Sequence, residues 1–145
     1  MSTEIHSKAP AWFWVFAVLA ILWNLVGVAA YLMDVTLSEE ALAQLPEAQR
    51  NLRAATPPWV TGCYAIAVFA GALGSIALLV RKAWATPLFA VSLAAVILQM
   101  GYVFIVMNAS EVLGAAAMIF PAIIIVLGIF WLWFSMLSKK QGWLS

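Results

Sequence analysis

The chain has 145 residues, of which 66% are hydrophobic and 9% charged, and its mean hydropathy is +1.04. Soluble domains are about half apolar and about one quarter charged, so this composition excludes a water-soluble globular domain and a disordered chain. A net charge of +1 without a basic cluster excludes a nucleic-acid-binding protein. One cysteine, Cys63, and one histidine, His6, are too few for a disulfide within the chain or for a metal site, and we expect no metal and no cofactor.

Long apolar segments follow one another along the chain, at residues 12–33, 59–80, 84–107 and 113–137. At a rise of about 1.5 Å per residue, each is longer than the roughly 30 Å hydrocarbon core of a bilayer. The first also exceeds the apolar core of a signal peptide, and we expect it to be retained. Short connections follow the second and third segments and favour antiparallel neighbours. The sequence therefore predicts one all-α, integral membrane, four-helix antiparallel bundle that spans residues 1–145.

The charged residues lie outside these segments, and their sign differs between the two predicted sides. One side carries five of the seven basic residues, which are Lys8, Arg81, Lys82, Lys139 and Lys140. The other side carries five of the six acidic residues, which are Asp34, Glu39, Glu40, Glu47 and Glu111, together with Arg50 and Arg53. By the positive-inside rule, both termini and the turn after the second span face the cytoplasm.

The longest connection, residues 34–58, shows a helical pattern of its own. Thr36 and Glu39 have the spacing of a capping box, and Pro46 suits the first turn of a second short helix. Pro57 and Pro58 would end that helix. We expect two short amphipathic helices on the outer surface, where they act as a surface cover, as a lid over a site or as a docking face for a partner.

The predicted spans contain no Asp, Glu, Lys, Arg or His. Proton-coupled carriers generally place an ionisable group inside the membrane, so coupling through such a group is not expected. A span without histidine or paired carboxylates also offers no general base and no haem ligand. The sequence therefore predicts that the protein is not an enzyme.

Uncharged polar residues occur at a similar depth in three of the spans. Asn24 on the first span and Gln99 on the third lie roughly 12–14 Å from the outer ends of their helices. Pro121 on the fourth would free a backbone carbonyl at much the same level. With Tyr64 and Tyr102 nearer the outside, these residues predict a pocket for an uncharged solute such as a sugar. In the alternative interpretation, Asn24 and Gln99 only hydrogen-bond neighbouring helices together.

Small residues form a stripe on the second span, where Ala67, Gly71 and Ser75 recur every four residues and Gly74 lies beside them. Such a stripe lets another helix approach closely. A neighbour within the chain is favoured, and a second copy of the chain is the alternative.

The chain resembles a family of small bacterial four-helix inner-membrane proteins that are commonly labelled sugar transporters. The resemblance spans nearly the whole chain and lies in WFW at 12–14, WNLVG at 23–27, YLM at 31–33, TPPWV at 56–60, FAGALGS at 69–75, RKAWA at 81–85, QM at 99–100 and GWLS at 142–145. It implies a bacterial inner (plasma) membrane location and a role in transport.

Two functions from different classes follow. The first is a carrier-like protein for a small neutral polar solute of sugar type, working as a homo-oligomer in the lipid bilayer. The alternative is a non-catalytic accessory or scaffold subunit of a larger membrane complex.

Overall fold

The computed structural model describes residues 8–145, so His6 lies outside the described part. Its long helices are α1 (Ala11–Val35), α4 (Pro58–Leu79), α5 (Ala85–Gly101), which continues through a π-helical turn (Tyr102–Val106), and α7 (Ile119–Lys140). No strand occurs within the described range. Four segments, Ala11–Val35, Pro58–Leu79, Ala85–Val106 and Ala115–Lys140, are long and apolar enough to cross a membrane. The predicted all-helical class is confirmed.

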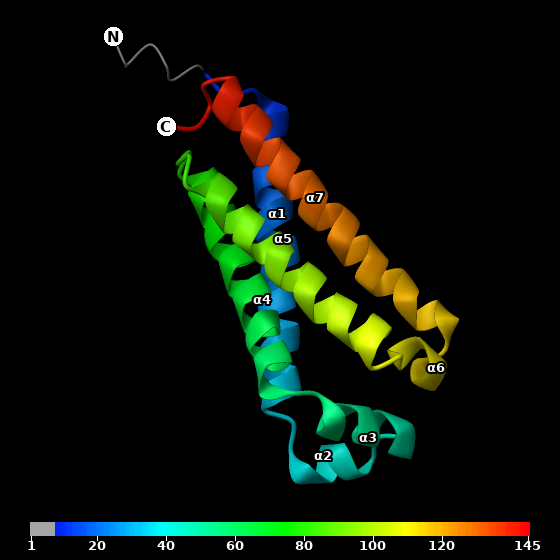
Figure 1. Ribbon diagram of the computed structural model, residues 1–145. Coiled ribbons are helices and arrows are strands. Elements are labelled where there is room, and N and C mark those ends of the chain that lie inside the picture. The colour runs from blue at the N-terminus through cyan, green and yellow to red at the C-terminus, as the bar shows by residue number, and fades with distance from the viewer. Residues whose placement is uncertain (1–7) are drawn as a thin grey trace.

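Helix α4 is the innermost of the long helices. It packs against both α1 and α5, while α7 packs against α5. In its most apolar stretch 44% of residues are buried, against 6–17% for the other three. Figure 1 shows that the start of α1 and the C-terminus lie at one end of the molecule, and that α2 and α3 lie at the opposite end. We call these the terminal end and the outer end.

The central place of α4 follows from its small residues. A Cβ at Gly71 would lie 2.2 Å from Asn24 Oδ1 on α1, and a Cβ at Gly74 would lie 3.1 Å from the ring of Phe89 on α5. Ala67 and Ser75, the other members of the stripe, are buried. The stripe therefore lies between two helices of the same chain, since only residues without larger side chains permit these approaches.

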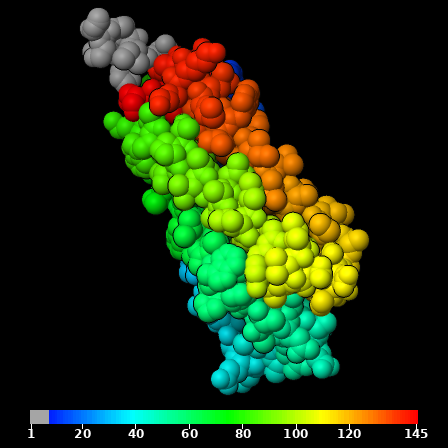
Figure 2. Space-filling model, viewed as in Figure 1, coloured from blue at the N-terminus to red at the C-terminus, as the bar shows by residue number. Residues whose placement is uncertain are grey.

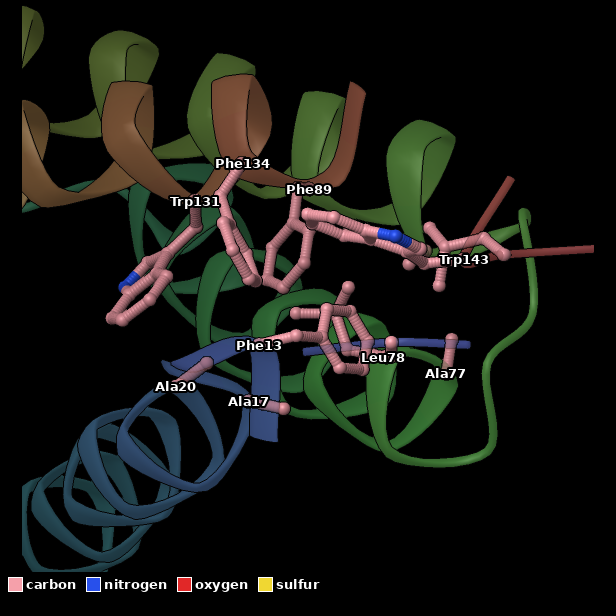
Figure 3. Packing of buried hydrophobic residues seen from close by; sticks show 12 residues of the cluster. Phe13, Ala17, Ala20, Ala77, Leu78, Phe89, Trp131, Phe134 and Trp143 are labelled. Carbon is pink, nitrogen blue, oxygen red and sulfur yellow. The ribbon is translucent and has the colours of Figure 1, made fainter. Parts of the chain in front are cut away.

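The terminal end is closed by a buried aromatic cluster, which we call the aromatic plug. Its largest members are Phe13, Leu78, Phe89, Trp131, Phe134 and Trp143. Phe13 stacks on Phe134 with ring centroids 5.7 Å apart, and Trp143 meets the edge of Phe13 at the same distance. Figure 3 shows these side chains facing one another from α1, α4, α5, α7 and the C-terminal segment. Aromatic rings bury large apolar areas, so the plug holds this end of the bundle together.

Residues 141–145 dock onto the turn between α4 and α5. The amide of Ser145 donates to the carbonyl of Arg81 at 3.0 Å, and the amide of Ala83 donates to the carbonyl of Ser145 at 2.9 Å. Arg81 Nε also donates to the carbonyl of Trp143 at 2.7 Å. This docking brings together two stretches, RKAWA and GWLS, that are about 60 residues apart in the sequence.

The segment between α1 and α4 forms two short helices, α2 (Glu39–Ala43) and α3 (Glu47–Ala55). The predicted capping box is wrong, because Ser38 caps α2 by accepting a hydrogen bond from the amide of Ala41. The Thr36 hydroxyl instead donates back to the carbonyl of Leu32 in α1. Ser38 directly precedes the helix, which places its oxygen beside the free amides of the first turn.

The connection between α5 and α7 is longer than predicted. It contains α6 (Ala109–Leu113) and a 3₁₀ turn (Ala115–Met118), with positive φ values at Asn108 (52°) and Gly114 (96°). Helix α7 therefore begins at Ile119, and Pro121 stands in its first turn. A proline there lacks an amide that has no helical partner in any case, so Pro121 does not create the free carbonyl predicted at the depth of Asn24 and Gln99.

Candidate functional site

A cavity of about 140 Å³ lies between the long helices, and all four contribute to its wall. Among the predicted site residues, Asn24, Tyr64 and Gln99 line it. The rest of the wall is largely apolar and includes Trp23, Phe89, Leu93, Val96, Met100, Phe120, Ile124 and Trp131. None of the lining residues is Asp, Glu, Lys, Arg or His. We call this space the inner cavity.

Asn24 both lines the inner cavity and joins helices. Its Nδ2 donates to the carbonyl of Ala20 at 2.8 Å and to Ser75 Oγ on α4 at 3.0 Å. Its Oδ1 lies over Gly71, where a Cβ would collide with it. Both amide hydrogens are therefore used within the protein, in agreement with the helix-joining interpretation for this residue.

Ser92 on α5 is held in the same way. Its hydroxyl donates to the carbonyl of Ala67 on α4 at 2.6 Å. A Cβ at Gly71 would lie 3.2 Å from Ser92 Oγ. Ser92 on α5 and Asn24 on α1 therefore approach α4 at the same glycine. The polar atoms in the middle of the bundle thus serve mainly to hold α1, α4 and α5 together.

A second cavity, of about 210 Å³, lies at the outer end where α3 meets the bundle. Its wall is polar and includes Asp34, Arg53, Thr56 and Thr61. Arg53 on α3 pairs with Asp34 at the end of α1, through the Asp34 carboxylate and also through its backbone carbonyl at 3.0 Å. We call this space the outer cavity. Figure 2 shows α3 and the neighbouring α6 covering this end of the molecule.

Tyr64 and Gln99 line both cavities. Neither the Tyr64 hydroxyl nor the Gln99 amide makes a hydrogen bond within residues 8–145, and the Tyr64 ring is placed by an edge contact with Tyr31 at 5.1 Å. A phenol and a primary amide can each donate and accept. Two polar groups without a partner among the described residues therefore stand between the inner and the outer cavity.

Tyr102 and Pro121, also predicted to line the pocket, do not line the inner cavity. Tyr102 packs its ring against Trp59 with centroids 4.9 Å apart, and it lines a groove beside α3. Three residues turn a helix by about 300°, so Tyr102 is rotated by about 60° from Gln99 and faces the start of α4 instead. The predicted site therefore contains Asn24, Tyr64 and Gln99, without Tyr102 and Pro121.

The inner end of the cavity was not predicted from the sequence. Phe89 and Trp131 belong both to its wall and to the buried cluster, so the aromatic plug closes it. The Trp131 indole nitrogen is buried and has no hydrogen-bond partner within the described residues, and Figure 3 shows it turned away from Phe13 and Leu78. A buried tryptophan is ordinarily read as packing. Trp131 differs from an ordinary packing residue because its buried indole N–H has no partner among these residues, and only the structure shows this.

Within residues 8–145 no group of three or more His, Cys, Asp or Glu residues is placed to hold a metal ion. The chemistry offered by the site is hydrogen bonding by uncharged groups beside an apolar wall. Comparison of the chain with protein-family models, curated proteins and solved structures finds no match.

Proposed function

We propose that this chain is a membrane protein that binds a small uncharged solute inside its four-helix bundle, as a carrier-like protein. One observation carries the proposal: Tyr64 and Gln99, whose polar groups have no hydrogen bond to any described residue, line both the outer and the inner cavity. A solute that enters beside α3 therefore meets two available hydrogen-bonding groups before it reaches the apolar interior.

The proposal places the four long helices across a bacterial inner membrane as antiparallel neighbours, with both termini in the cytoplasm. In its support, Arg81, Lys82, Lys139 and Lys140 belong to the terminal end of the molecule. Asp34 and the acidic first turns of α2 and α3 belong to the outer end. The positive-inside rule assigns the basic end to the cytoplasm. Reporter tags at both ends of the chain test this orientation.

The lack of charge on the inner wall supports an uncharged solute. A charged group in an apolar interior is costly unless it is paired, and no lining residue of the inner cavity carries a charge to pair with. In the outer cavity, Asp34 and Arg53 neutralise each other.

The contrast between the two ends supports a carrier-like mechanism. A polar cavity lies above the site at the outer end, whereas the aromatic plug closes the terminal end. Carriers alternate between states that are closed on one side or the other. The present arrangement corresponds to a state closed towards the terminal end, and release there requires the plug to separate.

Flux into proteoliposomes tests this function. The protein is reconstituted and uptake of a panel of labelled uncharged solutes is followed, first with the unaltered chain and then with the double variant Tyr64→Phe, Gln99→Leu. Tyr102→Phe is the matched control, because Tyr102 lies outside the inner cavity. The proposal requires saturable uptake that the double variant loses and the control keeps. Absence of saturable uptake for every solute contradicts it.

The accessory-subunit function is the alternative, and one feature favours it. A groove of about 570 Å³ runs along the outer end between α3, the π-helical turn and α6, and its wall includes Leu52, Val106 and Val112. An apolar groove of this kind suits a partner helix. Co-purification of the chain with a defined set of other membrane proteins in mild detergent would favour this function over transport, if the reconstituted chain also shows no solute uptake.

A further inference from the structure

The inner and outer cavities differ in chemistry, and this difference defines a class of ligand. The inner cavity, of about 140 Å³, is walled by side chains such as Phe89, Leu93 and Val96. An apolar cavity of about this size stays dry and accepts one benzene-sized group. The inner cavity is therefore suited to a single compact apolar group rather than to a molecule that is polar on all sides.

The polar groups beside that apolar space are not equally available. Asn24 Nδ2 and the Ser92 hydroxyl donate their hydrogens to groups of the protein. The Tyr64 hydroxyl and the Gln99 amide do not, and they lie at the junction with the outer cavity. Groups that can both donate and accept are thus available at the outer end of the apolar cavity, whereas the plug end offers only the N–H of Trp131, which has no partner within residues 8–145 and can donate but not accept. This difference between the two ends orients a bound molecule.

From the apolar wall and the position of these polar groups we infer that the site takes a small uncharged amphipathic molecule. Its apolar ring or branched alkyl group lies in the inner cavity, and one hydroxyl or amide group lies at Tyr64 and Gln99. This inference rests on the proposed solute-binding function and narrows it. A sugar carries hydroxyls on every face, and each hydroxyl buried against an apolar wall without a partner loses the hydrogen bonds that it makes in water. The ligand class is therefore a ring alcohol, a phenol or a compact amide rather than a sugar.

The test uses fluorine NMR with the full chain in lipid nanodiscs. The probes are 4-fluorobenzyl alcohol, which has the predicted shape and polarity, and a fluorinated glucose of similar size. Val96→Phe fills the inner cavity, and Val91→Phe is its matched control, because Val91 lies on the same helix and is half exposed on the outer surface. Tyr64→Phe removes one hydroxyl without changing the shape of the wall, so the test does not depend on Val96→Phe folding.

The inference predicts saturable binding of 4-fluorobenzyl alcohol that Val96→Phe abolishes, that Val91→Phe leaves unchanged and that Tyr64→Phe weakens about two- to tenfold, the loss of one hydrogen bond. Saturable binding of the fluorinated sugar alone would overturn the ligand class and leave the solute-binding function standing. Saturable binding of neither probe would overturn the ligand class, and the flux panel then decides the solute-binding function separately. Alcohol binding that is unchanged in both Val96→Phe and Tyr64→Phe would overturn the assigned location.

Discussion

Asn24 on α1 donates a hydrogen bond to Ser75 Oγ on α4 at 3.0 Å, in the middle of the bundle. Ser75 is fully buried and donates in turn to the carbonyl of Gly71 at 2.8 Å. The pair therefore fixes the distance between two long helices beside the wall of the inner cavity. Its strength decides how rigid that wall is.

A double-mutant cycle on Asn24→Ala and Ser75→Ala measures this strength. Hydrogen bonds between helices in membranes contribute about 1 kcal/mol, so we expect a coupling free energy of about 0.5–1.5 kcal/mol in the unfolding of the detergent-solubilised protein. Unfolding is followed by circular dichroism during titration with a denaturing detergent. Strict additivity of the two single changes would show that the bond does not hold α1 to α4.

Gly71→Ala should destabilise the protein. Its new methyl group would lie 2.2 Å from Asn24 Oδ1, so Asn24 must move and lose its bond to Ser75. Overpacking of this kind costs about 1–3 kcal/mol. Gly62→Ala on the same helix is the control, because nothing lies within 4 Å of its added methyl group and the higher helix propensity of alanine favours it. Equal thermal stability of the two variants would contradict the close approach at Gly71.

Trp143→Ala should weaken the aromatic plug. The centroid of the Trp143 ring lies 5.1 Å from that of Trp12 and 5.7 Å from that of Phe13, and Trp143 is only 9% exposed. Loss of a buried tryptophan costs about 3–5 kcal/mol. Trp133→Ala, which removes an indole that is 54% exposed, should cost much less in the same thermal unfolding experiment. If both variants unfold at the same temperature, the plug does not hold the terminal end.

Arg53→Ala should release α3 without unfolding the bundle. The Arg53 and Asp34 side chains are 35% and 39% exposed, so solvent screens their pair and its contribution is about 0–1 kcal/mol. We expect several-fold faster hydrogen exchange at the amides of α3 and an almost unchanged melting temperature. Arg50→Ala, on the exposed side of the same helix, should alter neither quantity. Unchanged exchange in Arg53→Ala would show that the pair does not position α3.

The long helices were predictable because each is a run of apolar residues long enough to cross a bilayer, a property of local sequence alone. The cap of α2 was not, because Thr36 and Ser38 are both suitable caps and the choice depends on where α1 ends. The docking of Ser145 on Arg81 joins distant segments and has no local signal.

Part of the candidate site was also predictable from local sequence. Asn24 and Gln99 are rare polar residues in apolar helices, and composition and depth alone placed them at one level. Tyr102 was assigned to the wrong surface because a rotation of about 60° separates it from Gln99, and only the contact with Trp59 decides its direction. The contribution of Trp131 to the cavity wall depends on how α7 packs against α5.

The central claim is that Gln99 stands at a water-accessible junction between the outer and inner cavities. In a Cys63→Ala background, the rate at which iodoacetamide alkylates Gln99→Cys in nanodiscs tests it, with Leu98→Cys as the reference because Leu98 is 60% exposed on the apolar outer surface of the bundle. Only a thiolate in contact with water reacts. We predict at least about tenfold faster labelling of Gln99→Cys, with protection by 4-fluorobenzyl alcohol. Equally slow labelling at both positions would contradict the account.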